Sequence, residues 1–234
     1  QGRQPLDEPV QVGGLGVDHD LPGHPEHAGR IRALWQELDS AGLSQRMNRL
    51  EPFPASEELI EVVHSRDYLS TLRQIERMTQ PVMHLNPDTY INPNGYMTAR
   101  LSAGGVVRAV DEVLAGRAQN ALAAVRPPGH HAMPSYSMGF CILGNVPIAA
   151  RYAQREHGLQ RILIVDYDVH HGNGTEAMFY DDPSILFIST HQHPFYPGTG
   201  ALKDIGTDAG RGYTINVPLS AGHSDRNYAA IFEA

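Results

Sequence analysis

The sequence predicts an α/β fold in which a mainly parallel sheet is flanked by helices. Short apolar runs such as 161–165 (RILIV) and 184–190 (SILFIST) lack the alternation of half-exposed strands, which is typical of strands covered on both faces. Segments with helical periodicity separate the runs, which indicates strand–helix–strand connections. The 234 residues are 41% hydrophobic and show no internal repeat or linker. We therefore expect a single domain spanning residues 1–234.

The first third of the chain is expected to be helical. Residues 24–43 carry an apolar stripe that includes Leu34 and should pack in the core, and Pro25 suits the first turn of this helix. Two shorter helices, each beginning after a serine, are expected within residues 56–78. Residues 81–95 (PVMHLNPDTYINPNG) are expected to be a loop, because they are rich in Asn and Pro.

Strands and helices alternate in the rest of the chain. The expected order is a helix at 96–114, a strand at 120–125, an irregular segment at 126–145, a helix at 146–159, a strand at 161–165, a short helix at 175–180, a strand at 184–190, a glycine-rich loop at 191–212 and a strand at 213–219. Polar clusters beginning at Arg126, Asp166 and His191 each follow a strand. Since ligands bind beyond the carboxyl ends of parallel strands, the functional site is expected there.

Composition narrows the function classes. The formal net charge of −8 argues against nucleic-acid binding as the main role and would suit a cationic substrate. The only cysteine, Cys141, excludes an intrachain disulfide and fits a reducing compartment. The sequence has no run of 18 apolar residues and no apolar signal core, so no membrane span is expected and the expected location is the cytoplasm. A homo-oligomer is left open.

The segment 166–170 (DYDVH) has the spacing of a metal site. In an extended segment, residues two apart face the same way, so the side chains of Asp166, Asp168 and His170 can converge. Carboxylate and imidazole ligands suit Zn²⁺, with Fe²⁺, Mn²⁺ or Co²⁺ as competitors. The alternative is a capped strand end with a satisfied Asp–His pair. The residues alone leave both interpretations open.

Two adjacent histidines, His130 and His131, lie on the irregular segment and are candidates for metal binding or proton transfer. A carboxylate behind one and a neutral amide behind the other would separate their pKa values, so that one could act as an acid and the other as a base. Asp166 and Asn173 are the candidates for these partners. A single histidine such as His64 is expected to be a surface residue or a satisfied core residue.

Several long segments occur in the order found in a known family. They are VRPPGHHA, MGFCILGNVPIAA, ILIVDYDVHHGNGT, ISTHQHPFYPGTG and INVPL, preceded by GHPEHAGRI and VHSRDYL. Over roughly residues 18–219 the sequence resembles the zinc-dependent histone deacetylase and acetylpolyamine amidohydrolase superfamily, on its class II and bacterial side. The resemblance implies a three-layer arginase/deacetylase-like fold with a mainly parallel sheet flanked by helices.

The resemblance also implies the roles of the polar clusters. Asp168 and His170 match the first two zinc ligands, and His131 matches the general base of the tandem histidine pair. The carboxylate named above would lie behind His130, and the amide of Asn173 would lie behind the other histidine of the pair.

A substrate tunnel and cation sites are implied as well. Phe140 and Tyr196 would form aromatic walls, the Gly139 carbonyl would lie near the leaving amine, and Asp88 would grip the substrate backbone at the rim. The family also holds K⁺ or Na⁺. By position, one site would use Asp166, Asp168, His170 and Ser189, and a second would use Phe179, Asp182, Ile185 and Tyr213.

The expected function is the hydrolysis of an acyl-amine. The substrate would be of acetyl-lysine or acetylpolyamine type, with metal-activated water and acid–base catalysis by the tandem histidines. The family's third zinc ligand, an Asp, and its transition-state Tyr are not found in this sequence, so the expectation is a catalytic domain incomplete at its C-terminus. Two alternatives remain: a catalytically impaired acyl-amine binding protein, and an arginase-like ureohydrolase, which would need two metals and more carboxylates.

Overall fold

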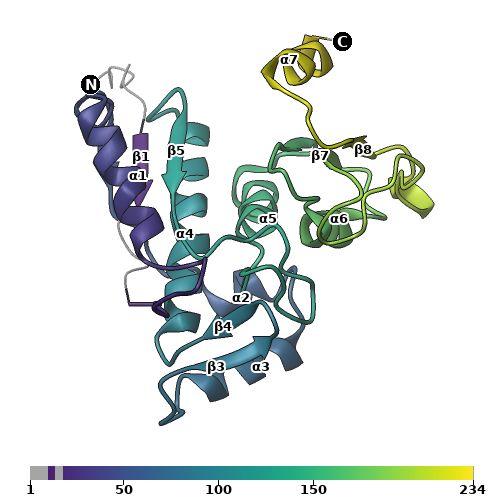
Figure 1. Cartoon of the computed structure of the whole chain (residues 1–234). Coiled ribbons are helices and arrows are strands. Elements are labelled where there is room, and N and C mark those ends of the chain that lie inside the picture. The colour runs from purple at the N-terminus through teal and green to yellow at the C-terminus, as the bar shows by residue number, and fades with distance from the viewer. Residues whose placement is uncertain (1–9, 14–17, 234) are drawn as a thin grey trace. The chain divides into compact units, whose positions relative to one another are not determined.

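The chain divides into two compact units, Gln1–Leu159 and Gln160–Ala234, in a computed structural model that describes residues 10–13 and 18–233 (Figure 1). The strands of the described residues form a parallel sheet in each unit and a two-stranded antiparallel sheet in the first. Strands predicted in the second half of the sequence thus pair in parallel. The expectation of one domain over residues 1–234 stays a prediction.

The parallel sheet of the first unit has the strand order β2–β1–β5. β1 (Val10–Gly13) lies between β2 (Asn48–Leu50) and β5 (Ala121–Ala124). The helix α4 (Gly95–Leu114) packs against β1 and β5 and buries Val12 in their shared core (Figure 1). The sequence did not predict β1 and β2, because runs of four and three residues are too short to show a period.

Helix α1 (Gly29–Ser40) begins later than predicted. Pro25 lies outside it, because residues before Gly29 form turns in which the Ala28 N–H donates to the Asp20 carboxylate at 2.7 Å. The expected apolar stripe is only partly correct, since Ile31 is buried whereas Leu34 is 42% exposed. A 3₁₀ turn at Ser44–Arg46 connects α1 to β2.

Two short helices follow the predicted serines. The Ser56 hydroxyl accepts a hydrogen bond from the Leu59 N–H at the start of α2 (Glu57–Ile60). The Ser65 hydroxyl likewise accepts from the Tyr68 N–H at the start of α3 (Arg66–Ile75). The apolar stripe of α3 is buried and consists of Tyr68, Leu69, Leu72 and Ile75. These caps satisfy backbone donors that have no partner inside a helix.

Residues 81–95 are not the loop that their composition predicted. They contain an antiparallel hairpin of β3 (Met83–Asn86) and β4 (Thr89–Ile91) (Figure 1). All three residues of β4 are buried. Burial in the tertiary structure therefore outweighs the local preference of Asn and Pro for turns.

The second unit has a parallel sheet in the order β6–β7–β8. Its strands are β6 (Ile162–Asp166), β7 (Ile185–Gln192) and β8 (Thr214–Leu219). Helix α6 (Asn173–Phe179) connects β6 to β7 and packs on β7, a 3₁₀ turn lies at Asp208–Gly210, and α7 (Asp225–Glu233) follows β8.

The first unit ends with α5 (Asn145–His157), which packs on α4. Gly158 ends α5 in the left-handed conformation, with φ 69°, as the sequence predicted. Across the described part of the chain, no helix combines the length and hydrophobicity needed to cross a membrane.

Candidate functional site

Asp166, Asp168 and His170, three of the predicted site residues, lie at the carboxyl end of β6 and are linked by hydrogen bonds. The Asp168 N–H donates to Oδ1 of Asp166 at 3.1 Å, and the His170 N–H donates to Oδ1 of Asp168 at 2.8 Å. That Asp168 oxygen also lies 3.1 Å from Nδ1 of His170. Two ligands about 2.0–2.1 Å from a tetrahedral Zn²⁺ are roughly 3.3 Å apart, so this pair of donors fits one ion.

The pair supplies two ligands. Among the residues that the structure describes, no group of three His, Cys, Asp or Glu side chains is assembled that could hold a metal ion. The structure thus brings together Asp168 and His170, and their assignment as zinc ligands stays a prediction. A satisfied Asp–His pair at a capped strand end is compatible with the same contacts.

Two aromatic rings border the predicted ligand His170. Phe195 stacks on the imidazole, with ring centroids 5.0 Å apart and an interplanar angle of 11°. Tyr196, the predicted tunnel wall, meets the same imidazole edge-on at 5.7 Å. The sequence reasoning did not single out Phe195, although its place beside Tyr196 in HPFYPG was a signal. The two rings restrict the orientation of His170.

A buried polar network ties this aromatic loop to the sheet. His171 Nδ1 lies 2.8 Å from the Thr199 hydroxyl, and His171 Nε2 lies 3.2 Å from Oε2 of Glu176. The same Glu176 oxygen accepts a hydrogen bond from Asn216 on β8 at 2.6 Å. The sequence pattern gave no role to His171, and its tertiary contacts make it a structural residue of this network.

Gly200 is fixed by the same network. It has φ +82°, and a Cβ added there would lie about 2.5 Å from Nε2 of His191 and 2.6 Å from the His171 ring. The Gly200 carbonyl is 2.9 Å from His191 Nε2. Burial lowers the pKa of His191, which favours the neutral imidazole.

The predicted first cation site lies at the carboxyl end of β6, beside β7. Asp166 is paired with Ser189 in the parallel register. Ser189 is fully buried, and its hydroxyl is 3.0 Å from Nδ1 of His191. The structure brings these residues together, and cation binding by them stays a prediction.

The predicted second cation site surrounds the connection from α6 to β7. The Phe179 carbonyl accepts from the Asp182 N–H at 3.0 Å, and the Asp182 carbonyl accepts from the Ile185 N–H at 3.5 Å. The Tyr213 carbonyl accepts from the Phe187 N–H at 2.8 Å. A carbonyl oxygen has two lone pairs and can accept more than one contact, and cation binding at this site also stays a prediction.

The tandem histidines lie in the first unit, on the segment between β5 and α5. The rings of His130 and His131 are 3.9 Å apart, and His131 is only 3% exposed. The His131 N–H donates to Sγ of Cys141 at 3.4 Å. Gly139 lies against the His131 ring so closely that a Cβ there would be 2.3 Å from Cδ2. The carboxylate and amide predicted behind the pair belong to the second unit, so that pairing stays a prediction.

The hairpin missed by the sequence reasoning supports the predicted tunnel residues. Gly139 and Phe140 form a two-residue turn between Met138 and Cys141, which exchange backbone hydrogen bonds of 3.1 and 2.8 Å. The Gly139 N–H donates to Oδ1 of Asp88 at 3.1 Å. The structure therefore brings three of the predicted tunnel residues together within the first unit.

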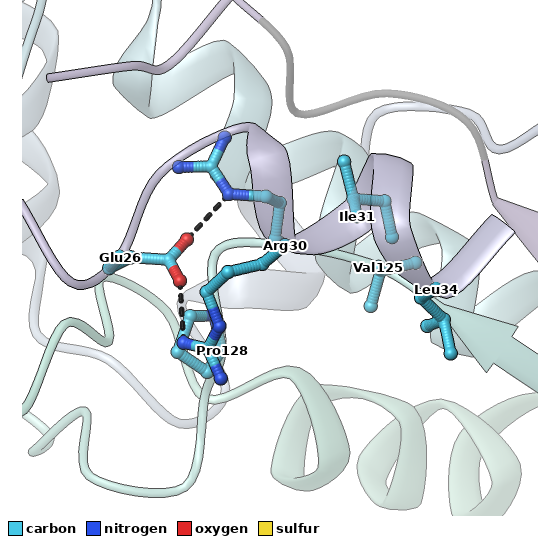
Figure 2. Close-up of a pocket in the computed structure, with 7 residues that line it drawn as sticks. Glu26, Arg30, Ile31, Leu34, Val125 and Pro128 are labelled. Atoms are coloured by element: carbon cyan, nitrogen blue, oxygen red, sulfur yellow. Dashed lines mark hydrogen bonds and ion pairs between the residues drawn. The ribbon is translucent and has the colours of Figure 1, made fainter. Parts of the chain in front are cut away.

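A buried ion pair lies at the start of the same irregular segment. Arg126 Nε is 2.6 Å from Oε1 of Glu26, and the two side chains are 4% and 2% exposed. The other Glu26 oxygen is 2.8 Å from Arg30. Figure 2 shows Glu26 with an interaction on each oxygen, beside a cavity of about 280 Å³ that is also lined by Ile31, Leu34, Val125 and Pro128. Two guanidinium groups around one carboxylate give this cavity a net positive charge.

Aromatic contacts extend from this ion pair to the predicted tunnel wall. The Tyr90 hydroxyl donates to the Glu26 carbonyl at 3.0 Å. His24 meets the rings of Tyr90 and Phe140 edge-on, at 4.7 and 5.2 Å. His19 stacks on Tyr90, and burial lowers its pKa to about 4. These contacts join residues that are far apart in the sequence, which is why no sequence pattern indicated them.

His64 is a buried core residue, as the sequence predicted, but it is only partly satisfied, because its Nδ1 has no hydrogen-bond partner among the described residues. Its Nε2 accepts a hydrogen bond from the Gly144 N–H at 2.9 Å, at the start of α5. Burial lowers the pKa of His64 from its ordinary value of 6.5 to about 4, so the folded protein holds it neutral. The unfolded chain binds the proton more readily between these values. His64 therefore reduces stability as the pH falls from about 6.5 towards 4.

The chain is similar to known deacetylases in sequence and in structure. A family model described as "Histone deacetylase domain" matches residues 24–234. The Histone deacetylase-like amidohydrolase of Pseudomonas aeruginosa is 42% identical over 214 residues, which cover 91% of this chain and 56% of that protein. The Polyamine deacetylase HDAC10 of Rattus norvegicus is 40% identical over 214 residues, covering 87% of this chain and 36% of that protein.

A crystal structure of the HDA15 HD domain matches with a TM-score of 0.91 at 34% identity, and the match covers 97% of this chain and 66% of that one. The α/β deacetylase-like fold that the sequence predicted is thus confirmed. The chain spans about half the length of several curated relatives, between 52% and 58%. Since the family model matches most of its residues, the chain belongs to the histone deacetylase domain family.

Proposed function

We propose that the protein hydrolyses the amide bond of an acylated amine at a zinc site that includes Asp168 and His170. The observation that carries this proposal is the 3.1 Å separation of Asp168 Oδ1 and His170 Nδ1 at the carboxyl end of a parallel strand. When bound, zinc would supply a Lewis acid that polarises the acyl carbonyl and activates water. Iron or another divalent ion with similar ligand preferences is the competitor.

The residues of the second unit prepare the metal ligands. Asp166 orders the ligand segment by accepting the Asp168 N–H, which leaves the next carboxylate directed to His170. Phe195 and Tyr196 restrict the imidazole ring of that ligand. A ligand pair held in place before the metal arrives needs less ordering when it binds.

The tandem histidines would move the protons of the reaction. The buried His131 would take a proton from water on a ring nitrogen and deliver it to the leaving amine. Its partner His130, 3.9 Å away between ring centroids, would share the acid–base work. In this proposal Asp166 orients His130 and Asn173 orients His131, so that the two imidazoles titrate apart.

The proposed substrate is an acylated lysine side chain or an acylated polyamine. Phe140 and Tyr196 would flank a linear aliphatic amine, the Gly139 carbonyl would accept a hydrogen bond from the nitrogen, and Asp88 would bind the substrate at the rim. A net charge of −8 favours a cationic substrate, and one relative is named a polyamine deacetylase. The cytoplasmic location, the K⁺ or Na⁺ sites and a homo-oligomer stay predictions.

A second candidate is an acyl-amine binding protein without turnover. This alternative is kept because Asp168 and His170 are two of the three protein ligands that a catalytic zinc ion usually has. An arginase-like ureohydrolase has less support, because it would require a second metal and further carboxylates.

Acetate release separates these candidates. The intact protein should release acetate from an acetyl-lysine peptide or an acetylated polyamine, lose this activity with a chelator and regain it with zinc. His131→Ala should abolish turnover, whereas His223→Ala, at an exposed histidine, should not. Tight peptide binding without turnover after zinc is restored would favour the binding protein. Two transition-metal ions per chain would favour the ureohydrolase.

A further inference from the structure

We propose that Thr89 is a positioning residue for substrate binding, because its hydroxyl holds the backbone of Phe140 in place. The inference rests on the proposed function, in which Phe140 is a wall of the substrate tunnel. Thr89 itself would not touch the substrate. It lies on β4 of the hairpin that the sequence did not predict, and it is fully buried.

The turn that carries Phe140 has an unusual backbone. Its two central residues, Gly139 and Phe140, have φ +55° and +69°. Positive φ at both positions is the pattern of a two-residue hairpin turn, which normally has Gly, Asn or Asp there. A bulky aromatic residue rarely adopts this conformation and persists in it only where surrounding contacts enforce it.

The hairpin supplies these contacts. In such a turn the central N–H groups are not bonded within the turn. Here the Gly139 N–H donates to Oδ1 of Asp88 at 3.1 Å, and the Phe140 N–H donates to Oγ1 of Thr89 at 3.0 Å. The Thr89 hydroxyl in turn donates to Oδ1 of Asp88 at 2.7 Å. Each central amide thus has its own side-chain acceptor on the hairpin, and the two acceptors are bonded to each other.

The buried hydroxyl of Thr89 has two tasks in this arrangement. It must accept from the Phe140 N–H and donate to Asp88 at the same time, and neither task is open to a side chain without a polar atom. Its place is fixed by the register of the hairpin, in which Thr89 pairs with Asn86. On the side-chain side of the turn, His24 meets the Phe140 ring at 5.2 Å. The hairpin therefore holds the backbone of Phe140, and His24, in the segment before α1, contacts its ring.

Removal of the Thr89 hydroxyl should weaken substrate binding but should not slow the chemical step. Without its acceptor, the Phe140 N–H favours a turn in which φ becomes negative, which moves the ring away from its position beside the substrate. A wall contacts the substrate equally in the ground state and the transition state, so its loss raises KM while kcat is unchanged. The same loss should speed hydrogen exchange at the Phe140 amide about fivefold or more, the factor that corresponds to about 1 kcal/mol for one hydrogen bond.

The test compares three variants of the intact protein. Thr89→Val has nearly the same shape but no hydroxyl, and Thr89→Ser keeps the hydroxyl. Thr98→Val is the matched control, since Thr98 is also buried but its hydroxyl donates to the carbonyl of Asn94, the residue before α4, at 2.9 Å. We expect Thr89→Val to raise KM for an acetyl-lysine peptide at least fivefold with kcat within twofold, and to speed exchange at the Phe140 amide. The Ser variant and the control should behave like the wild type.

Two readouts separate this inference from the proposed function. If the wild type shows no turnover, the proposed function fails, and exchange at the Phe140 amide alone decides the role of Thr89. Unchanged exchange and unchanged KM in Thr89→Val would overturn the inference, as would a Ser variant as impaired as Val. If Thr89→Val does not fold, Thr89→Ala, which also lacks the hydroxyl, is measured in the same way and must show the same changes.

Discussion

Replacing Glu26 by glutamine should lower the free energy of unfolding by about 3 kcal/mol. Glu26 and Arg126 are joined at 2.6 Å, with side chains 2% and 4% exposed. Removing one charge of a buried pair leaves the other poorly compensated, and such changes cost about 3–5 kcal/mol. Glutamine keeps an oxygen that can accept a hydrogen bond from a guanidinium, so the lower end of that range is expected.

Urea unfolding measures this difference, provided that the slope against urea concentration is the same in variant and wild type. Glu58→Gln is the matched control. Glu58 pairs with Arg155 at 3.1 Å, but its side chain is 81% exposed, and exposed pairs contribute only about 0–1 kcal/mol. A loss for Glu26→Gln no larger than that of the control would refute the reasoning.

A double variant tests the same reasoning from the other side. Glu26→Leu combined with Arg126→Met removes both charges and leaves apolar side chains of similar size. It should be less destabilised than the sum of the two single variants by about 2 kcal/mol or more, because no buried charge is then left without its partner. Additive losses would mean that the two groups do not stabilise each other.

Three further outcomes follow from the geometry. The wild type should lose about 2 kcal/mol of its free energy of unfolding between pH 7 and pH 5, because the pKa of His64 is about 4 in the folded protein and 6.5 in the unfolded chain. His64→Gln should remove this loss in urea unfolding. An unchanged pH dependence would contradict the buried neutral state. Gly200→Ala should destabilise by about 3 kcal/mol through its clash with two imidazoles and its positive φ, whereas Gly198→Ala, with a positive φ but nothing within 4 Å, should lose only about 1 kcal/mol in the same measurement. His170→Ala and Asp168→Ala should each abolish stoichiometric zinc binding measured by equilibrium dialysis, and retained binding in both would place the metal elsewhere.

Local features of the fold followed from the sequence. Serine caps at Ser56 and Ser65, the buried stripe of α3 and the glycine at the end of α5 all appear where the local pattern predicted them. The sequence also placed Asp166, Asp168 and His170 at the end of β6, but residues 168–170 form bends rather than the extended segment from which their convergence was predicted. The predictions failed where no period could form, as in β1 and β2, and where local composition misled, as in the β3–β4 hairpin.

The sequence by itself determined the family, the residues of the proposed chemistry and the strand ends that carry them, since each depends on short-range order along the chain. Only the tertiary structure decided what holds those residues in place. Glu26 meets Arg126 and Thr89 meets Phe140 across long stretches of sequence, and His171 reaches Thr199 and then Asn216 through Glu176. Such contacts depend on which buried donors and acceptors meet when distant segments pack. No periodicity or spacing in a single sequence records that choice.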